Sequence, residues 1–184
     1  MNVLVTGGTG ALGRPLVTQL RQAGHYARIL TREPQGHVDA VKGDLATGAG
    51  LVKAVAGIDT IIHAASATRE PTKGNSTDVL GTRRLLALAR DAQVRHFVYV
   101  SIVGMEGVAY PYYRTKLATE AVVRENIVPW SILRATQFHT LMEFFLRGFC
   151  RVPGLAALPF TWQFQPVDTG DVARRLIDVA AGEP

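Results

Sequence analysis

The sequence contains a single cysteine, Cys150, so no disulfide bond can form within the chain. A chain without disulfides suits a reducing compartment, and we therefore expect a cytoplasmic protein. No stretch reaches the ~20 consecutive apolar residues that a membrane-spanning helix needs, so we expect no membrane span. The chain begins directly with residues 2–5, which are typical of a strand, and we expect no signal peptide.

Long runs of one charge are also missing, although the formal net charge is +5. The basic residues are spread along the chain, and their longest runs are the pairs Arg83-Arg84 and Arg174-Arg175. A nucleic-acid-binding surface usually clusters its basic residues, often between aromatic ones, so this pattern argues against a nucleic-acid partner. An excess of positive charge equally suits a small polyanionic ligand.

The sequence has no internal repeat, low-complexity tract or linker, and we predict one domain over residues 1–184. Short strand-like runs alternate with helical runs, which predicts βαβ units and a doubly wound parallel sheet, the Rossmann fold. The predicted strands are 2–6, 26–31, 40–42, 60–65, 96–101 and 130–133. The predicted helices are 11–23, 51–56, 79–92, 112–125 and 168–181, the last capped by Asp168 or Asp171.

Beyond residue 136 the pattern loosens, and we expect residues 137–184 to contribute a short substrate or lid region. Residues 141–149 are apolar and aromatic, and residues 152–160 contain Pro153, Gly154 and Pro159. This stretch is either a lid over a ligand or a partner surface, as in a homo-oligomer, or a core helix followed by a loop. The sequence does not decide between these interpretations.

A glycine-rich turn, TGGTGALG at residues 6–13, lies between the first predicted strand and the first predicted helix. Its glycines match both the G-x-G-x-x-G pattern and its wider-spaced relative. Glycines there allow a tight turn, a close approach of the backbone to a pyrophosphate, and close packing of helix on strand. The pyrophosphate would lie at the helix N-terminus, where free N–H groups stabilise negative charge. The turn therefore predicts a dinucleotide cofactor.

The residue at the end of the second strand should select the cofactor. NAD-binding proteins usually have an acidic residue there, whereas NADP-binding proteins have an arginine. Arg32 follows the predicted strand with no acid before it, and its guanidinium could pair with a 2′-phosphate. Glu33 comes next, and an Arg32 that only faces solvent is the alternative. We favour NADP, with NAD as the second choice.

Tyr112 and Lys116 are four residues apart on one face of a predicted helix. A nearby ammonium stabilises a phenolate, so such a tyrosine could exchange protons near neutral pH. The lysine could also bind the nicotinamide ribose. Ser101, at the end of the fifth predicted strand, could bind a substrate carbonyl or simply cap the strand. No metal site is predicted.

Together these motifs resemble the short-chain dehydrogenase/reductase superfamily, in particular its extended and atypical branches, which include NmrA-like proteins and relatives of nucleotide-sugar epimerases. The matching segments are residues 6–13 (TGGTGALG), 43–45 (GDL), 63–65 (HAA), 81–82 (GT), 96–101 (HFVYVS), 112–116 (YYRTK), 133–136 (LRAT), 164–168 (FQPVD) and 171–173 (DVA).

The resemblance implies roles for particular residues. The pyrophosphate would be lined by the glycine turn: Gly7, Thr9, Gly10, Ala11, Leu12 and Gly13. The rest of the cofactor would lie along Arg32, Asp44, Leu45, Ala64, Ala65 and Lys116. Catalysis would use Tyr112 as proton donor, Lys116 as its helper, and Ser101.

The chain departs from the family pattern in three places. Residues 101–104 (SIVG) lack the double serine of active epimerases, and the family's asparagine on the preceding helix appears as Asp78 or is displaced to Asn75. The chain also ends at Pro184, so it is either truncated or a minimal family member with a small substrate lobe. Three hypotheses result: an oxidoreductase acting on a carbonyl or alcohol, a non-catalytic NADP(H) sensor, and a nucleotide-sugar epimerase relative.

Overall fold

The computed structural model describes residues 1–67, 75–149 and 165–184, and within them six parallel strands form one sheet. The strand order is β3-β2-β1-β4-β5-β6. The strands are β1 (Asn2–Thr6), β2 (Tyr26–Thr31), β3 (Ala40–Lys42), β4 (Thr60–His63), β5 (His96–Ile102) and β6 (Trp130–Ala135). Because the order reverses at β1 and β4, the loops that follow these two strands border the crevice where α/β proteins bind ligands.

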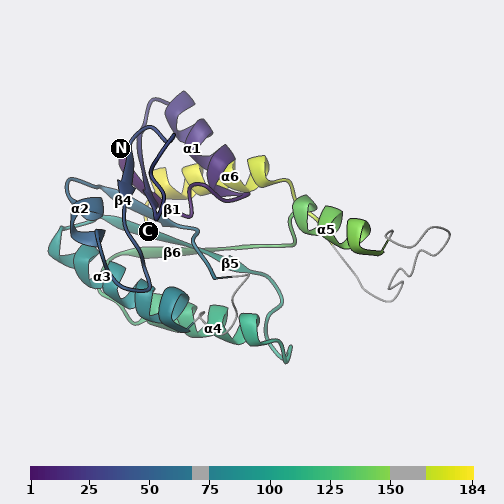
Figure 1. The fold of residues 1–184 in the computed structure, drawn as a ribbon. Coiled ribbons are helices and arrows are strands. Elements are labelled where there is room, and N and C mark those ends of the chain that lie inside the picture. The colour runs from purple at the N-terminus through teal and green to yellow at the C-terminus, as the bar shows by residue number, and fades with distance from the viewer. Residues whose placement is uncertain (68–74, 150–164) are drawn as a thin grey trace.

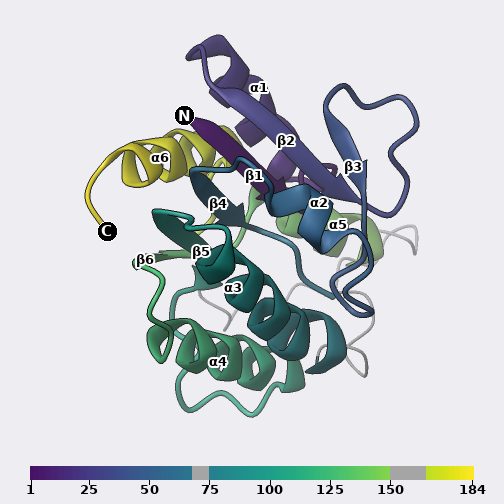
Figure 2. The ribbon, with the colours of Figure 1, turned by 90° about the vertical axis from the view of Figure 1, so that its left-hand side faces the viewer.

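Helices cover both faces of the sheet (Figure 1). One face carries α1 (Gly13–Gln22) and α6 (Thr169–Ala181), and the other carries α2 (Leu51–Val55), α3 (Gly81–Asp91) and α4 (Pro111–Arg124) (Figure 2). One π-helical turn, η2 (Asn75–Leu80), leads directly into α3. The helix α5 (His139–Phe149) extends away from these layers (Figure 1). The predicted doubly wound Rossmann fold is confirmed.

The side chains of each strand alternate between two hydrophobic clusters, because successive residues of a strand point to opposite faces. On β1, Leu4 joins the cluster under α2, α3 and α4, while Val3 and Val5 join the one under α1 and α6. On β5, Tyr99 belongs to the first cluster and Val100 to the second. This burial on both faces explains why the central strands are hydrophobic almost throughout.

Most predicted elements are observed, with shifted ends. The strand β4 ends at His63, two residues before the predicted end, and β6 continues two residues beyond it, to Ala135. The helix α3 begins at Gly81, because the residues before it form η2. Asp168, one of the two proposed caps, is the N-cap of α6, because its carboxylate accepts a hydrogen bond from Gly170 N at 2.7 Å.

The C-terminal helix α6 lies in the Rossmann layer beside α1, where Gln19 Nε2 donates to Gly170 O at 3.0 Å. Residues 139–149 of the expected lid region form α5, and residues 152–160 lie outside the described residues. Of the helices in the described residues, none combines the length and the apolar character needed to cross a bilayer.

Candidate cofactor and catalytic site

The glycine turn packs closely against backbone atoms, and at two of its positions, Gly7 and Gly13, only glycine fits. Gly7 has a φ of +71°, and a Cβ there would lie 2.8 Å from Ala65 N. A Cβ on Gly13 would lie 2.1 Å from Gly7 O and 2.5 Å from Gly8 Cα. Both glycines are therefore needed to fold the turn, whereas a Cβ on Gly10 would meet only Gly7 O, at 3.2 Å.

The N-terminus of α1 offers free hydrogen-bond donors. Within the described residues, the amide groups of Ala11, Leu12 and Gly13 have no hydrogen-bond acceptor. The helix has no side-chain cap and no acidic residue in its first turn. Arg14 Nε donates to Thr9 O at 2.9 Å and braces the turn. These unpaired donors fit a dinucleotide pyrophosphate, which needs N–H groups and a backbone without side chains at close range.

A buried chain of hydrogen bonds connects the turn to the neighbouring strand. Ala65 N donates to Thr6 Oγ1 at 3.2 Å, and Thr6 Oγ1 lies 2.6 Å from His63 Nδ1. His63 Nε2 lies 2.9 Å from Thr82 Oγ1, whose hydroxyl donates to the carbonyl of Asp78. Because Thr82 has already used its proton, Nε2 must carry the imidazole proton and Nδ1 must accept from Thr6.

The imidazole of His63 is neutral. His63 is completely buried, and burial together with the positive charge of Lys116 lowers its pKa to about 3. A neutral imidazole provides one donor and one acceptor, which is what its two hydroxyl partners require. His63 therefore positions Ala65 against Gly7 and is a structural part of the site.

The other predicted cofactor residues also lie after the carboxyl ends of strands. Ala64 and Ala65 follow β4 and are partly exposed. Asp44 and Leu45 follow β3: the carboxylate of Asp44 accepts from Ala46 N at 2.9 Å, and the side chain of Leu45 is buried in the core. Leu45 can therefore offer a cofactor its backbone only.

Arg32 is exposed directly after β2, where the sequence places the cofactor-selecting residue. A cavity of about 290 Å³ lies between the glycine turn, α1 and the loop that follows β2. Its lining includes two arginines, Arg14 and Arg21, the second of which is paired with Asp39 at 3.5 Å. The cavity adds positive charge beside Gly8, and sequence reasoning had assigned this charge to Arg32 alone.

Tyr112 lies in the first turn of α4, and its phenol is partly buried. Its Oη lies 3.2 Å from Ser66 Oγ, and Ser66 follows the Ala64–Ala65 pair. The pKa of Tyr112 is raised to about 12, mainly by burial and further by the charge of Asp78, although a hydrogen bond donated by Ser66 would act in the opposite direction. The expected lowering of this pKa by Lys116 is therefore not found.

Lys116 is buried with 4% of its surface exposed. Its Nζ donates to Val100 O at 2.7 Å and to Tyr99 Oη at 3.0 Å. Burial lowers its pKa to about 8, while the charges of Asp78 and Glu120 act in the opposite direction. Within the described residues no hydrogen bond joins Lys116 to Tyr112, so the structure places the pair on one helix without direct contact.

Ser101 is buried on the face of β5 that α4 covers, and its hydroxyl has no well-formed hydrogen bond to any residue that the structure describes. The hydroxyl is close enough to Glu120 to help lower the pKa of that carboxyl. Ser66 is the serine beside the phenol, and sequence reasoning missed it. The signal was available, because Ser66 continues the HAA segment at the end of β4.

Sequence reasoning also missed an ion-pair network on the same face, in which Glu120 is buried and its arginine partners are partly exposed. Glu120 accepts from Arg134 Nε and Nη2 at 2.8 and 2.7 Å, and from Arg124 Nη2 at 3.0 Å. Arg134 also donates to Glu106 at 2.6 Å. Burial raises the pKa of Glu120, but hydrogen bonds from Arg134 outweigh it and the pKa is lowered. The network joins α4 to the end of β6.

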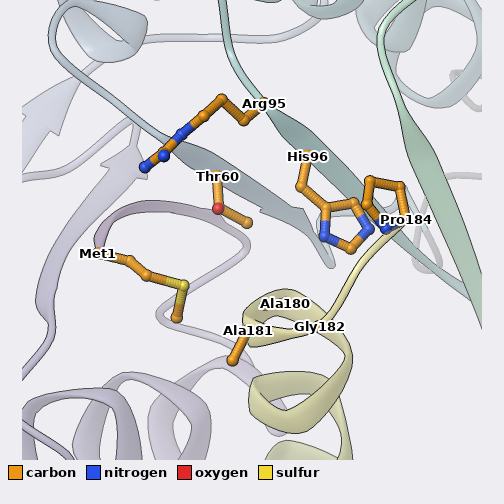
Figure 3. A pocket seen from close by; sticks show the side chains of 8 residues that line it. All are labelled: Met1, Thr60, Arg95, His96, Ala180, Ala181, Gly182 and Pro184. Atoms are coloured by element: carbon orange, nitrogen blue, oxygen red, sulfur yellow. The ribbon is translucent and has the colours of Figure 1, made fainter.

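A second cavity, of about 280 Å³, lies at the opposite edge of the sheet (Figure 3). Its lining consists of Met1, Thr60, Arg95, His96, Ala180, Ala181, Gly182 and Pro184. The imidazole of His96 is among the side chains drawn in Figure 3, and burial lowers the pKa of this imidazole. None of the predicted cofactor or catalytic residues borders this cavity.

The family model described as NAD(P)H-binding matches residues 7–141. The chain belongs to the NAD(P)H-binding family. The match includes most of the glycine turn and continues through α4, so it covers the cofactor segments and the tyrosine–lysine pair. The prediction that the chain is an NAD(P)H-binding protein is confirmed by this match.

Two curated relatives are named as dehydrogenase and reductase. The chain is 39% identical over 114 residues to a 3-beta-hydroxysteroid dehydrogenase of Mycolicibacterium neoaurum, covering 54% of this chain and 31% of that protein. It is 31% identical over 190 residues to a ceramide reductase of Caulobacter vibrioides, covering 95% of this chain and 59% of that protein. The chain thus spans between about a third and three fifths of the length of these relatives.

A solved structure confirms the fold. The chain superimposes with a TM-score of 0.78 on a short-chain dehydrogenase/reductase superfamily protein of Agrobacterium tumefaciens with bound NAD. The two sequences are 22% identical, and the match covers 98% of this chain and 74% of that one.

Proposed function

We propose that this protein is an NAD(P)-dependent oxidoreductase that transfers hydride between its cofactor and the carbonyl or alcohol group of a small molecule. The observation that carries the proposal is the 3.2 Å contact between Tyr112 Oη and Ser66 Oγ. Ser66 directly follows Ala65, whose backbone is in contact with Gly7. The contact therefore sets the only phenol of the predicted catalytic pair beside the predicted cofactor segments.

The cofactor would supply the hydride, and the protein would supply position and a proton. The open amides of Ala11, Leu12 and Gly13 would hold the pyrophosphate. Tyr112 would donate its proton to the carbonyl oxygen, a task for which a protonated phenol is suited. Lys116 would add a positive charge beneath the site, next to Val100 at the end of β5.

The first experiment measures NADPH and NADH binding by fluorescence and then screens carbonyl substrates for cofactor consumption. Tyr112→Phe should lower kcat by about 100-fold or more while the cofactor dissociation constant stays within a factor of about two. Tyr26→Phe is the control, because Tyr26 begins β2 at the opposite edge of the sheet. Tight cofactor binding without consumption would favour the sensor hypothesis. Interconversion of nucleotide sugars without net consumption would favour the epimerase.

The substrate screen should emphasise apolar ketones. Val103, Val108 and Tyr110 expose 46–49% of their surfaces in the loop between β5 and α4, next to the predicted proton donor. The two named relatives are a steroid dehydrogenase and a ceramide reductase. Steroid and long-chain ketones should therefore be turned over with lower KM than small hydrophilic ketones. Equal KM values for both classes would contradict an apolar substrate.

We further propose that NADP is the preferred cofactor. The support is Arg32 after β2, together with the basic cavity that Arg14 and Arg21 line beside Gly8. A guanidinium paired with the 2′-phosphate of NADPH forms a charge-assisted hydrogen bond. NADH lacks this phosphate and cannot form the bond. Arg32→Ala should lower the NADPH/NADH affinity ratio about tenfold. Arg90→Ala is the matched control, because Arg90 pairs with Asp91 at the end of α3.

An unchanged ratio in Arg32→Ala would remove Arg32 from the phosphate site. The same measurement on Arg14→Ala would then show whether the cavity carries the preference. If neither variant changes the ratio, the assignment of the preference to these arginines is wrong, and a wild-type ratio that favours NADH would contradict the preference itself.

A further inference from the structure

The residues around Tyr112 include a carboxylate that the proposed hydride transfer does not use. Asp78 is 2% exposed and lies in η2, the π-helical turn that packs against both α3 and α4. Its Oδ1 accepts from Ser66 Oγ at 2.5 Å, and its Oδ2 accepts from Ala67 N at 3.0 Å. Single π-helical turns are rare and occur frequently at functional sites.

Ser66 links this carboxylate to the phenol, because its Oγ is within hydrogen-bond distance of both. Oγ lies 2.5 Å from Asp78 Oδ1 and 3.2 Å from Tyr112 Oη. A serine hydroxyl has one proton and an ionised carboxylate has none, so Ser66 must donate to Asp78. The oxygen of Ser66 then accepts, and the phenol of Tyr112 must donate to it.

We propose that Ser66 and Asp78 hold the phenol of Tyr112 in its protonated, hydrogen-donating form and fix its orientation, so that they act as positioning residues for the proton donor. This inference rests on the proposed function, because a proton donor is needed only if the protein catalyses the reaction. The hydrogen bonds themselves can be tested without turnover. Losing the proton would leave a phenolate that receives no hydrogen bond from Ser66 and faces the negative charge of Asp78. The arrangement therefore favours the protonated phenol that carbonyl reduction needs, and its O–H would turn from Ser66 Oγ to the substrate oxygen when a substrate binds.

Several other charged or titratable groups face this cluster. Tyr110 precedes α4 and Tyr113 lies on it, with ring centroids each 6.3 Å from that of Tyr112. The ammonium of Lys116 interacts with the charge of Asp78 and is itself engaged by Val100 O. Lys116 therefore offsets part of the negative charge of Asp78. The hydrogen bonds through Ser66 connect Asp78 to the phenol of Tyr112 and favour its protonated form.

The test reads the phenol directly, without any substrate. The protein is labelled with 3-fluorotyrosine, whose phenol titrates at lower pH than that of tyrosine, and the ¹⁹F signal of residue 112 is assigned with Tyr112→Phe. Asp78→Asn removes the charge but keeps the shape, and it should lower the midpoint of that titration by about one pH unit. The signal of Tyr26 is the internal control and should not move.

The sign of the effect of Ser66→Ala decides the hydrogen-bond direction. If the phenol donates to Ser66, removing the acceptor destabilises the neutral phenol, and the midpoint should fall. If Ser66 instead donates to the phenol, the midpoint should rise, and the inference is overturned. Ser66→Thr keeps the hydroxyl and should restore the wild-type midpoint, which separates the hydrogen bond from a packing effect.

With a substrate in hand, the same variants give a second readout. Alcohol oxidation needs the phenolate as base, so Asp78→Asn should shift the rise of kcat with pH to lower pH, by the same amount as the NMR midpoint. An unchanged NMR midpoint in Asp78→Asn overturns the inference even if the enzyme turns over. A shifted midpoint in a protein that consumes no cofactor supports the link and contradicts the proposed oxidoreductase activity.

Discussion

The glycine turn and the N-terminal half of α4 form two sides of the predicted site, but different physical effects hold them in place. In the turn, Gly7 and Gly13 are required because any Cβ would collide with backbone atoms. On α4, Lys116 and Tyr112 are held by a few polar contacts in a buried environment that disfavours charge. The first side depends on shape, and the second depends on hydrogen bonds made after burial.

The largest effect on stability is expected at Gly13, which packs against Gly7 and Gly8 within the turn. Gly13→Ala should abolish folding, because its Cβ would lie 2.1 Å from Gly7 O. Gly10→Ala should fold with nearly unchanged stability, because its Cβ would meet only Gly7 O, at 3.2 Å, but it should weaken cofactor binding by filling the space beside the pyrophosphate. Circular dichroism and NADPH titration of the two variants would test this. Similar stability of both variants would contradict steric control of the turn.

On the α4 side, the next largest effect is expected at Glu120. Glu120→Gln removes a buried carboxylate from two partly exposed arginines, Arg134 and Arg124, and should lower the free energy of unfolding by about 2 kcal/mol. Glu143→Gln, in an exposed pair with Arg147 on α5, is the control and should change it by less than about 0.5 kcal/mol. Urea unfolding measures both, and equal effects would mean that burial does not strengthen the Glu120 network.

A third effect concerns the histidine that connects the two sides. The pKa of His63 is about 3 in the folded protein, below its ordinary value of 6.5, so the unfolded chain binds the proton first as the pH falls. His63 should therefore reduce stability by about 1.6 kcal/mol as the pH falls from 6.5 to 5. His63→Gln, whose amide also offers one donor and one acceptor, should lack this part of the pH dependence. Parallel stability curves for both proteins would show a charged or exposed imidazole.

The smallest effect is expected at Lys116. Its pKa is about 8 in the folded protein against 10.5 ordinarily, so its burial penalty is complete below pH 8 and is relieved as the pH rises toward 10.5. The wild type should gain about 1 kcal/mol from pH 8 to pH 9 that Lys116→Met does not gain. The Met variant should also lose the reductase activity proposed above. Unfolding curves at the two pH values measure the difference, and an equal gain in the variant would mean that Lys116 is hydrated.

Local sequence patterns predicted the parts of the protein that depend on local physics. The order of strands and helices follows from hydrophobic periodicity, and the glycine spacing predicts the turn because backbone conformation is a local property. The position of Tyr112 at the carboxyl edge follows from the same element order. The ends of β4 and α3 were less predictable, because the π-helical turn before Gly81 depends on packing against α4.

What only the tertiary structure decided is which polar groups meet. Ser66 and Asp78 are 12 residues apart and meet at Tyr112, which lies 46 residues from Ser66. Lys116 is on the predicted face, but its Nζ binds Val100 O instead of reaching the phenol. The sequence by itself determined the Rossmann fold and its dinucleotide-binding turn, because periodicity and glycine sterics act over a few residues. The protonation of Tyr112 was decided by burial and by charges from distant segments, which a local pattern does not encode.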